Sequence, residues 1–187
     1  NVVERSSINL APPLCHLVLA SQYEMQQLQR WFNNAEQLHN WGGDSFDYPC
    51  TAQQFIAQLC RPATQSYSLI TGHAAQWVGF GQLCDRFGCH HLARLVIAPT
   101  HRGKGLARTL IYELFIKALA EQPKPFSLYV HRHNRLALQL YIALGFVITA
   151  PPEPENPRLH FMTLEAGAAN ALVQGYLSDV NRRVDER

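Results

Sequence analysis

The distribution of apolar and polar positions predicts that strands and helices alternate along much of the chain. The first short apolar run covers residues 15–20, and its leucine and valine content favours a strand. Three further runs are separated by glycine turns and are expected to pair as antiparallel strands, at residues 66–71, 76–84 and 90–98. The remaining strands are expected at residues 126–131, 146–149 and 158–164. Strands interleaved with helices in this way predict a mixed α/β sheet.

Helical periodicity and capping residues predict the helices. Ser21 followed by Glu24 has the pattern of a capping box, and it predicts a helix that continues to about residue 32. Thr51 is expected to cap a second helix, which stops before Pro62. Three more helices are expected at residues 106–121, 134–144 and 166–180, the last broken or kinked at Gly175.

Three features of the intervening chain stand out. Residues 33–49 are polar and aromatic and are expected to form an irregular loop, a setting that often carries recognition. Residues 150–157 are rich in proline and cannot pair as a sheet. Gly79 and Gly81 weaken the interior of a strand, so the sequence predicts either a close approach to that backbone or a simple bulge.

The segment from residue 91 to residue 119 passes from a strand, through a glycine-rich turn, into an amphipathic helix. The glycines let the backbone approach a ligand, and the helix start offers unpaired N–H groups and a positive dipole end. This arrangement is typical of a pyrophosphate site. It is not a P-loop, because Lys104 is followed by Gly105, and a dinucleotide fingerprint would need a small residue at Arg108.

Two motifs in this half of the chain resemble those of the GNAT superfamily of N-acetyltransferases. Arg102-x-x-Gly105-x-Ala107, placed after an apolar strand that ends in Pro99, resembles the coenzyme A signature of that superfamily. A second stretch, Asn134-x-x-Ala137-x-x-Leu140-Tyr141-x-x-x-Gly145-Phe146, resembles another of its motifs, in the same order and spacing. The resemblance covers residues 15–165 and is tightest from residue 91 to residue 146.

The resemblance implies an acyl-CoA N-acyltransferase fold of the α/β class, with a mixed sheet of six to seven strands. Its fourth and fifth strands are expected to splay apart, and its helices to cover both faces. Residues 1–165 would form the acetyltransferase domain. Residues 166–187 would form a helical extension or tail, for which a dimer contact, a packing appendage and a frayed end remain open.

The same resemblance implies acetyl-CoA as co-substrate and assigns residues to it. The backbone of Leu95, Val96 and Ile97 would bond the pantetheine amides, with an N–H near Val96 stabilising charge on the thioester oxygen. Asn134 would hold the cofactor arm. The pyrophosphate would bind to the turn and helix start formed by Arg102, Gly103, Lys104, Gly105, Leu106 and Ala107, although Lys104 could instead point into solvent.

Tyr141 is the expected general acid, which would protonate the departing thiolate. A phenol of pKa about 10 can pass a proton to a sulfur of pKa about 8.5 as negative charge develops there. The alternative is a core tyrosine on an apolar helix face.

A general base is useful because an alkyl ammonium of pKa about 10 must lose a proton before it attacks. His91 occupies a position where many superfamily members carry a glutamate, and it is the first candidate. A plain strand histidine is the alternative. Asp85, Tyr129 and His131 are reserves, as is a water relay.

These assignments predict direct acetyl transfer from acetyl-CoA to a primary amine of a small molecule or peptide, within a ternary complex. Asp44 and Asp47 would favour a cationic amine if they rim the acceptor mouth. Relatives of the ribosomal-protein type, which acetylate protein N-termini, carry a glutamate at the position of Tyr129, and its absence here weakens a peptide-terminus assignment. The alternative from another class is a non-catalytic acyl-CoA-binding module or sensor.

Composition narrows the setting of this activity. The chain has 187 residues and a formal net charge of +2, which fits one domain and gives no reason to expect nucleic acid. The sequence has no run of eighteen apolar residues, so we expect no membrane contact, and residues 1–14 do not resemble a signal peptide. A cytoplasmic location is therefore expected. A homodimer stays open, because the C-terminal extension is a candidate dimer contact.

The cysteines and their neighbouring histidines are candidate ligands of a metal ion. Five scattered cysteines do not suggest a disulfide framework, so free thiols are expected. Cys84, Cys89, His90 and His91 offer four N or S ligands, but their spacing is not that of a zinc finger. Because adjacent residues of a strand point to opposite faces, His90 and His91 would not bind the same metal ion. We therefore expect no metal.

Overall fold

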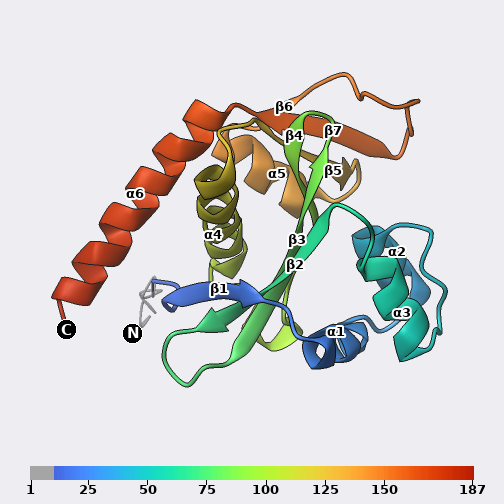
Figure 1. Cartoon of the computed structure of the whole chain (residues 1–187), viewed down its shortest axis with the longest axis horizontal. Coiled ribbons are helices and arrows are strands. Elements are labelled where there is room, and N and C mark those ends of the chain that lie inside the picture. The colour runs from blue at the N-terminus through green and yellow to red at the C-terminus, as the bar shows by residue number, and fades with distance from the viewer. Residues whose placement is uncertain (1–10) are drawn as a thin grey trace, which may run out of the picture.

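A single mixed sheet organises the computed structural model, which describes residues 11–187 (Figure 1). Its seven strands lie in the order β1-β2-β3-β4-β5-β7-β6, and only β4 and β5 run parallel. The strands are β1 (Cys15–Leu19), β2 (Thr64–Thr71), β3 (Trp77–Arg86), β4 (Cys89–Ile97), β5 (Phe126–His131), β6 (Val147–Ile148) and β7 (Leu159–Leu164). The expected α/β class and mixed sheet are confirmed. Residues 1–10, with most of the segment in which no signal peptide was expected, lie outside the described range.

The helices connect and cover these strands. They are α1 (Gln22–Leu28), α2 (Ala35–Gly42), α3 (Ala52–Leu59), α4 (Leu106–Glu121), α5 (Arg135–Leu144) and α6 (Ala166–Asp185), with short 3-10 helices at Gln29–Trp31 and Pro99–His101. In Figure 1, α1, α2 and α3 gather at one end of the molecule, α6 lies at the other end, and α4 lies between α6 and the central strands. No helix among the described residues is both long enough and apolar enough to cross a membrane.

The expected caps are present. Ser21 and Glu24 form a capping box at the start of α1, and Thr51 does the same for α3 with Gln54. The side chain of Asn134 accepts a hydrogen bond from the N–H of Ala137 at the start of α5. These local bonds satisfy N–H groups that a helix start leaves free, which explains why short polar motifs located the helices so well.

Two expectations about the helices were wrong. Residues 33–49 were expected to be irregular, but they contain α2, which Asn34 caps and which packs Leu38 and Trp41 into an apolar cluster around Phe55. Burial of those side chains stabilises a helix that local propensity alone does not favour. The last helix was expected to be broken or kinked at Gly175, yet α6 runs through this residue as one uninterrupted helix.

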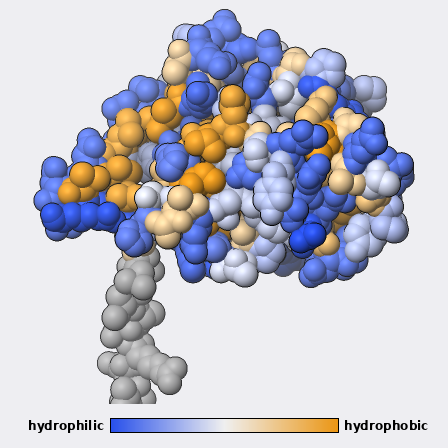
Figure 2. Space-filling view, turned by 60° about the horizontal axis from the view of Figure 1, so that its bottom comes forward, coloured by the Kyte–Doolittle hydropathy of each residue, from blue (hydrophilic) through white to orange (hydrophobic). Residues whose placement is uncertain are grey.

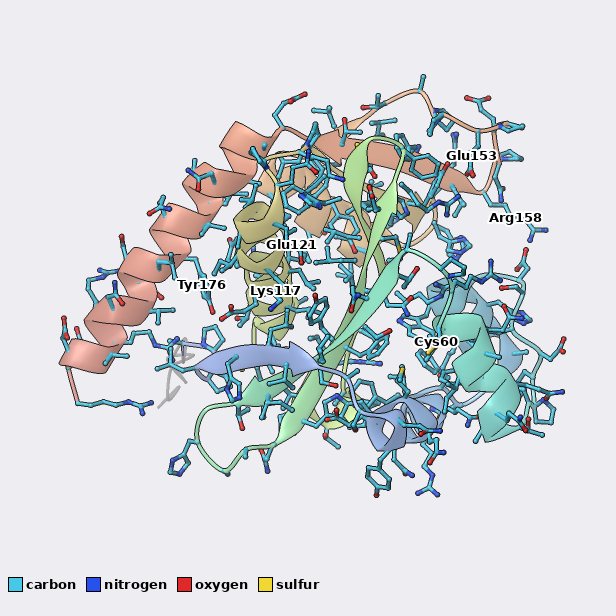
Figure 3. All side chains as sticks on the ribbon, viewed as in Figure 1. Cys60, Lys117, Glu121, Glu153, Arg158 and Tyr176 are labelled. Atoms are coloured by element: carbon cyan, nitrogen blue, oxygen red, sulfur yellow. The ribbon has the colours of Figure 1, made fainter. Side chains whose placement is uncertain are left out.

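Packing against α4 explains why α6 tolerates a glycine. Ala169 and Val173 are buried against the main apolar cluster, which also contains the core side chains of α4. The hydroxyl of Tyr176, on the side of α6 that faces α4 in Figure 3, donates to a carboxylate oxygen of Glu113 at 3.0 Å. A helix-interior glycine costs only about 1 kcal/mol relative to alanine, and these contacts outweigh it. The division of the chain at residue 165 stays a prediction.

The two glycines of β3 lie against side chains of neighbouring elements. A Cβ at Gly81 would come within 2.8 Å of Leu95 and 3.0 Å of Leu114, so these side chains use the space that a glycine leaves. The pairing of β3 with β4 also shifts register between Phe80 and Gln82. Both alternatives raised by the sequence, a close approach and a bulge, are therefore found together.

The parallel pair at the centre of the sheet opens after three residue pairs. Pairing of β4 with β5 covers His90 to Leu92, and the last pair joins Leu92 to Leu128. Beyond this point the two strands continue without pairing to each other. The expected splay of the fourth and fifth strands is confirmed, and it leaves the edges of two central strands free of sheet hydrogen bonds.

Candidate active site

A cleft of about 570 Å³ occupies the gap between the splayed strands. Its walls come from β4 and β5, from the facing sides of α4 and α5, and from the chain around α2. Of the residues that the sequence singled out, the cleft brings together Leu95, Val96, Ile97, Arg102, Ala107, Asn134 and Tyr141, along with Tyr129 and His131.

One end of the cleft is formed by the turn before α4. Gly103 and Gly105 have positive φ angles of 75° and 78°, which glycine adopts without the steric cost of a side chain. Gly105 is the N-cap of α4, and no side chain caps this helix. The first N–H groups of α4 are therefore available to an anion, and the helix dipole favours one.

The basic residues of this turn differ in placement. Arg102 lines the cleft, and its Nε donates to the carbonyl oxygen of Ile97 at 3.1 Å, which holds the side chain against the end of β4. Gly103, Lys104 and Gly105 are exposed beside the cleft, and Leu106 is buried beneath it. An uncapped helix start flanked by Arg102 suits the pyrophosphate of coenzyme A.

The free edge of β4 offers backbone groups along the cleft. The N–H of Ala98 donates to Val78 of β3 at 2.8 Å, so this amide points away from the gap. Successive amides of a strand point in opposite directions, and the N–H groups of Ile97 and Leu95 therefore face β5. The amide of Val96 faces β3. The backbone N–H donors left free along the cleft are therefore those of Leu95 and Ile97.

Tyr141 enters the cleft from α5. Its ring packs edge to face against Phe146, with ring centroids 5.8 Å apart. Burial raises the pKa of its phenol to about 12, so the hydroxyl keeps its proton at neutral pH. A protonated phenol beside the free edge of β4 has the form of a proton donor.

His91 lies outside the cleft lining. Only 4% of its surface is exposed, and its Nδ1 lies 2.8 Å from the hydroxyl of Ser127, in the part of β4 and β5 that is still paired. Burial, together with the charges of Arg86 and Arg94, lowers the pKa of His91 to about 4. The structure does not bring His91 into the cleft with Tyr141.

Two of the three reserve bases line the cleft. Burial and the charge of His133 lower the pKa of His131, and the charge of Asp44 opposes them. Its buried Nδ1 has no hydrogen-bond partner within residues 11–187. Asp85 instead forms an exposed ion pair with Lys124 at 2.8 Å, outside the cleft lining.

Tyr129 joins the cleft to the loop that precedes β7. Its hydroxyl donates to one oxygen of Glu153 at 2.9 Å, and the other oxygen of Glu153 pairs with Arg86 at 2.8 Å. Burial and this acceptor raise the pKa of Tyr129 to about 12. The hydroxyl of Tyr129 is therefore occupied, whereas Nδ1 of His131 has no such partner.

The sequence did not predict the part of the cleft wall that α2 forms. Gln37, Asn40 and Trp41 line the cleft from residues 33–49, where an irregular loop was expected, and Trp31 and Phe32 line it from the end of the first expected helix. The spacing Asn34-x-x-Gln37 is a capping signal, and it could have located this helix. Arg94 was also missed, although a lone arginine in the apolar run 92–97 was a visible signal.

Two acidic residues expected at the acceptor mouth do not line the cleft. Asp44 lies close enough to His131 to raise its pKa, and Asp47 acts on the pKa of Cys50 in the same direction. The cysteine and histidine pairs of β3 and β4 form no metal-like cluster either. Among residues 11–187, no three His, Cys, Asp or Glu side chains gather closely enough to hold an ion.

Two splayed parallel strands over a cleft, with an uncapped helix start at one end of it, form the arrangement expected from the acetyltransferase motifs. A family model described as an acetyltransferase (GNAT) domain matches residues 20–166, and the chain belongs to this family. It is therefore an N-acetyltransferase that uses acetyl-CoA as the acetyl donor.

Solved structures have the same fold. A spermidine N-acetyltransferase from Vibrio cholerae, in complex with CoA and spermine, is 19% identical with a TM-score of 0.66, over 83% of this chain and 97% of that one. The aminoglycoside acetyltransferase AAC(6')-Ib, in complex with coenzyme A, is 16% identical with a TM-score of 0.66, over 84% of this chain and 98% of that one. Both solved chains are matched over nearly their whole length.

Proposed function

We propose that the protein acetylates a primary amine of a small molecule or peptide by direct attack within a ternary complex. The observation that carries this proposal is a single cleft lined by the free edge of β4, the phenol of Tyr141 and the imidazole of His131. The spermidine and aminoglycoside enzymes act on amines, and the latter has been solved with kanamycin at a TM-score of 0.65 to this chain.

Acetyl-CoA supplies an activated acetyl thioester, and the chain's own groups would orient it. The N–H groups at the start of α4 and the side chain of Arg102 bind the pyrophosphate. The exposed edge of β4 at Leu95 and Ile97 bonds the pantetheine amides and polarises the thioester carbonyl. Asn134, whose side-chain oxygen already caps α5, has its amide N–H groups free for the same arm.

Proton transfer completes the reaction. The amine nitrogen attacks the thioester carbon, the carbon–sulfur bond breaks, and Tyr141 donates its proton to the sulfur. The apolar surroundings that raise the pKa of the phenol also raise that of a nearby thiol, so the proton transfer stays balanced. His131 accepts the proton that the amine loses, directly or through water. His91 remains the sequence-based candidate for this role, but its burial outside the cleft favours His131.

The proposal is tested by measuring CoA release from acetyl-CoA over a panel of primary amines and short peptides. Release with at least one amine, and its loss in Tyr141→Phe without loss of acetyl-CoA binding, would support it. Binding of acetyl-CoA without release for any amine would instead favour an acyl-CoA-binding module.

We also propose that the protein works in the cytoplasm. All five cysteines are free thiols, and two of them are buried. Free thiols are typical of a reducing compartment, which is also where acetyl-CoA-dependent acetylation would find its donor. Mass spectrometry of the protein isolated under alkylating conditions tests this, because disulfides in the native protein would argue against it.

A homodimer is the assembly that we propose for this enzyme. Figure 2 shows hydrophobic residues gathered where α6 projects from the body of the molecule. Val184 on this helix is 54% exposed and Leu177 is 36% exposed. Light scattering on the intact chain and on Val184→Asp measures the assembly, and a monomeric intact chain would contradict the proposal.

A further inference from the structure

Arg94 is a partly buried cation at the bulge of β4, and it lines the cleft. Its φ angle of 53° is unusual for a residue with a side chain and turns this residue out of the regular strand. Nη1 donates to the side-chain oxygen of Gln82 at 2.9 Å, and Nε to the carbonyl oxygen of Gly42 at 3.3 Å. The guanidinium also lies 5.4 Å from the ring centroid of Phe46.

The groups that contact the guanidinium of Arg94 are a side-chain amide, a backbone carbonyl and an aromatic ring, and none of them carries a negative charge. Gln82 is completely buried and is itself fixed, since its amide nitrogen donates to Leu59 and Ser66. Gly42 ends α2, so its carbonyl contributes only the negative end of a helix dipole. Nη2 of Arg94 makes no hydrogen bond to any of residues 11–187. The guanidinium is therefore rigidly positioned and still has donors to offer.

No carboxylate compensates this charge. Arg94 forms no ion pair within the described part of the chain. Burial lowers the pKa of its guanidinium, and the positive charges of Arg61 and Arg86 lower it further, whereas the thiol of Cys84 acts in the opposite direction. The cleft lining contains no aspartate or glutamate at all. A partly buried cation without a counter-ion is costly, so this site favours an anionic group from outside the chain.

The position of Arg94 separates it from the phosphate end of the cleft. Along β4 the phosphate end lies beyond Ile97, where Arg102 is bonded, whereas Arg94 lies beside Ala93 and the last paired residue, Leu92. Its partners Gly42 and Phe46 lie at and just after the end of α2, on the side of the cleft to which the cofactor motifs contribute no residues. An anion at Arg94 would therefore belong to the acceptor and not to coenzyme A.

We propose that the acceptor is an amine that also carries a carboxylate, as an amino acid does, and that Arg94 binds this carboxylate. The inference rests on the proposed function and names the class of acceptor for the same cleft. A planar guanidinium binds a carboxylate through parallel N–H donors, which fixes both distance and orientation. The same positive charge disfavours polycations and helps the acceptor amine lose its proton.

The experiment compares amines that differ only by a carboxylate, in CoA-release assays with acetyl-CoA as donor. Suitable pairs are leucine with isoamylamine, phenylalanine with phenethylamine, and lysine with cadaverine. We expect kcat/KM to be on the order of 10- to 100-fold higher for the amino acid of the preferred pair, the usual effect of a charge-assisted hydrogen bond. Arg94→Gln should abolish that ratio, because the reaction of the amino acid weakens more than that of its decarboxylated partner.

A matched control and a binding measurement make the result specific. Arg102→Gln removes the other cleft arginine and should weaken acetyl-CoA binding while leaving the ratio within each amine pair unchanged. Arg94→Lys keeps the charge but loses the paired donors, and we expect an intermediate ratio. Thermal shift with CoA plus N-acetylated amino acids, or their decarboxylated analogues, reports carboxylate binding without requiring turnover.

Each outcome separates this inference from the proposed function. Carboxylate-dependent binding that Arg94→Gln abolishes supports the inference, even if no amine releases CoA and the proposed catalysis fails. Equal or better turnover of the decarboxylated amines would overturn the inference while leaving acetyl transfer intact. An unchanged preference in a folded Arg94→Gln that still binds acetyl-CoA would also overturn it, and would leave Arg94 as a support for α2.

Discussion

Nδ1 of His91 lies 2.8 Å from the hydroxyl oxygen of Ser127, and this contact joins β4 to β5 just before the two strands separate. The imidazole also packs edge to face against Phe87, with ring centroids 5.2 Å apart. A histidine held in this way is a structural brace for the closed part of the sheet. Its neutral form is the one that these surroundings favour.

The free energy of unfolding should therefore fall as pH drops from about 6.5 to about 4, the range over which the folded protein keeps His91 neutral. The unfolded chain binds this proton near pH 6.5 and the folded chain only near pH 4, so acid favours unfolding between those values. The full difference corresponds to about 3 kcal/mol. Urea unfolding of the protein and of His91→Gln at pH 7 and pH 4.5 measures it, and a variant with the same pH dependence as the parent would contradict this role.

Removing the phenol of Tyr141 should lower turnover and leave cofactor binding intact. We expect Tyr141→Phe to reduce kcat by about 10- to 1000-fold, because one proton-transfer group typically contributes this much. The phenylalanine ring keeps the contact with Phe146, so the fold should not change. Single-turnover kinetics and calorimetry with acetyl-CoA measure the two effects, and Tyr176→Phe, which lies on α6, is the control. An unchanged kcat would remove the assignment.

The pH–rate profile should identify the base. A base must be neutral to act, so activity carried by His131 falls as pH drops through its lowered pKa, which lies below 6.5. If His91 were the base, the acid limb would lie near pH 4. We expect His131→Gln to lose the limb and about 100-fold in kcat/KM, after normalisation for the neutral fraction of the amine. Retention of the limb would show that His131 is not the base.

A side chain at Gly105 should weaken acetyl-CoA binding. With φ at 78°, an alanine there costs about 1 to 2 kcal/mol and shifts the N–H groups at the start of α4. We expect roughly 5- to 30-fold weaker acetyl-CoA binding by calorimetry. Gly88→Ala is a matched control, because Gly88 has a φ of 68° and lies in the turn between β3 and β4. Equal weakening in both variants would mean that backbone strain alone is responsible.

The sequence predicted best those features that depend on neighbouring residues. Ser21 with Glu24 and Thr51 with Gln54 are local patterns, and the capped helices they predict are present. The splay of the fourth and fifth strands followed from the resemblance to family motifs, whose spacing is also short range.

The features that the sequence did not predict depend on contacts between distant segments. The helix α2 is stabilised when Trp41 packs against Phe55, an interaction that no local pattern shows. Neither does the apolar run around Arg94 reveal that its side chain meets Gln82 and Gly42. Burial of His91 and exposure of His131 to the cleft likewise depend on where β4 and β5 part, and periodicity alone does not show that point.

The parting of β4 from β5 leaves the middle of the sheet without backbone pairing beyond Leu92 and Leu128. The amide hydrogens of Leu95 and Ile97 belong to the central strand of the sheet, yet they are not paired with β5. In the empty protein they should exchange with solvent deuterium as fast as those of an edge strand. Bound pantetheine would act as a short eighth strand, so cofactor binding and completion of the sheet become one event.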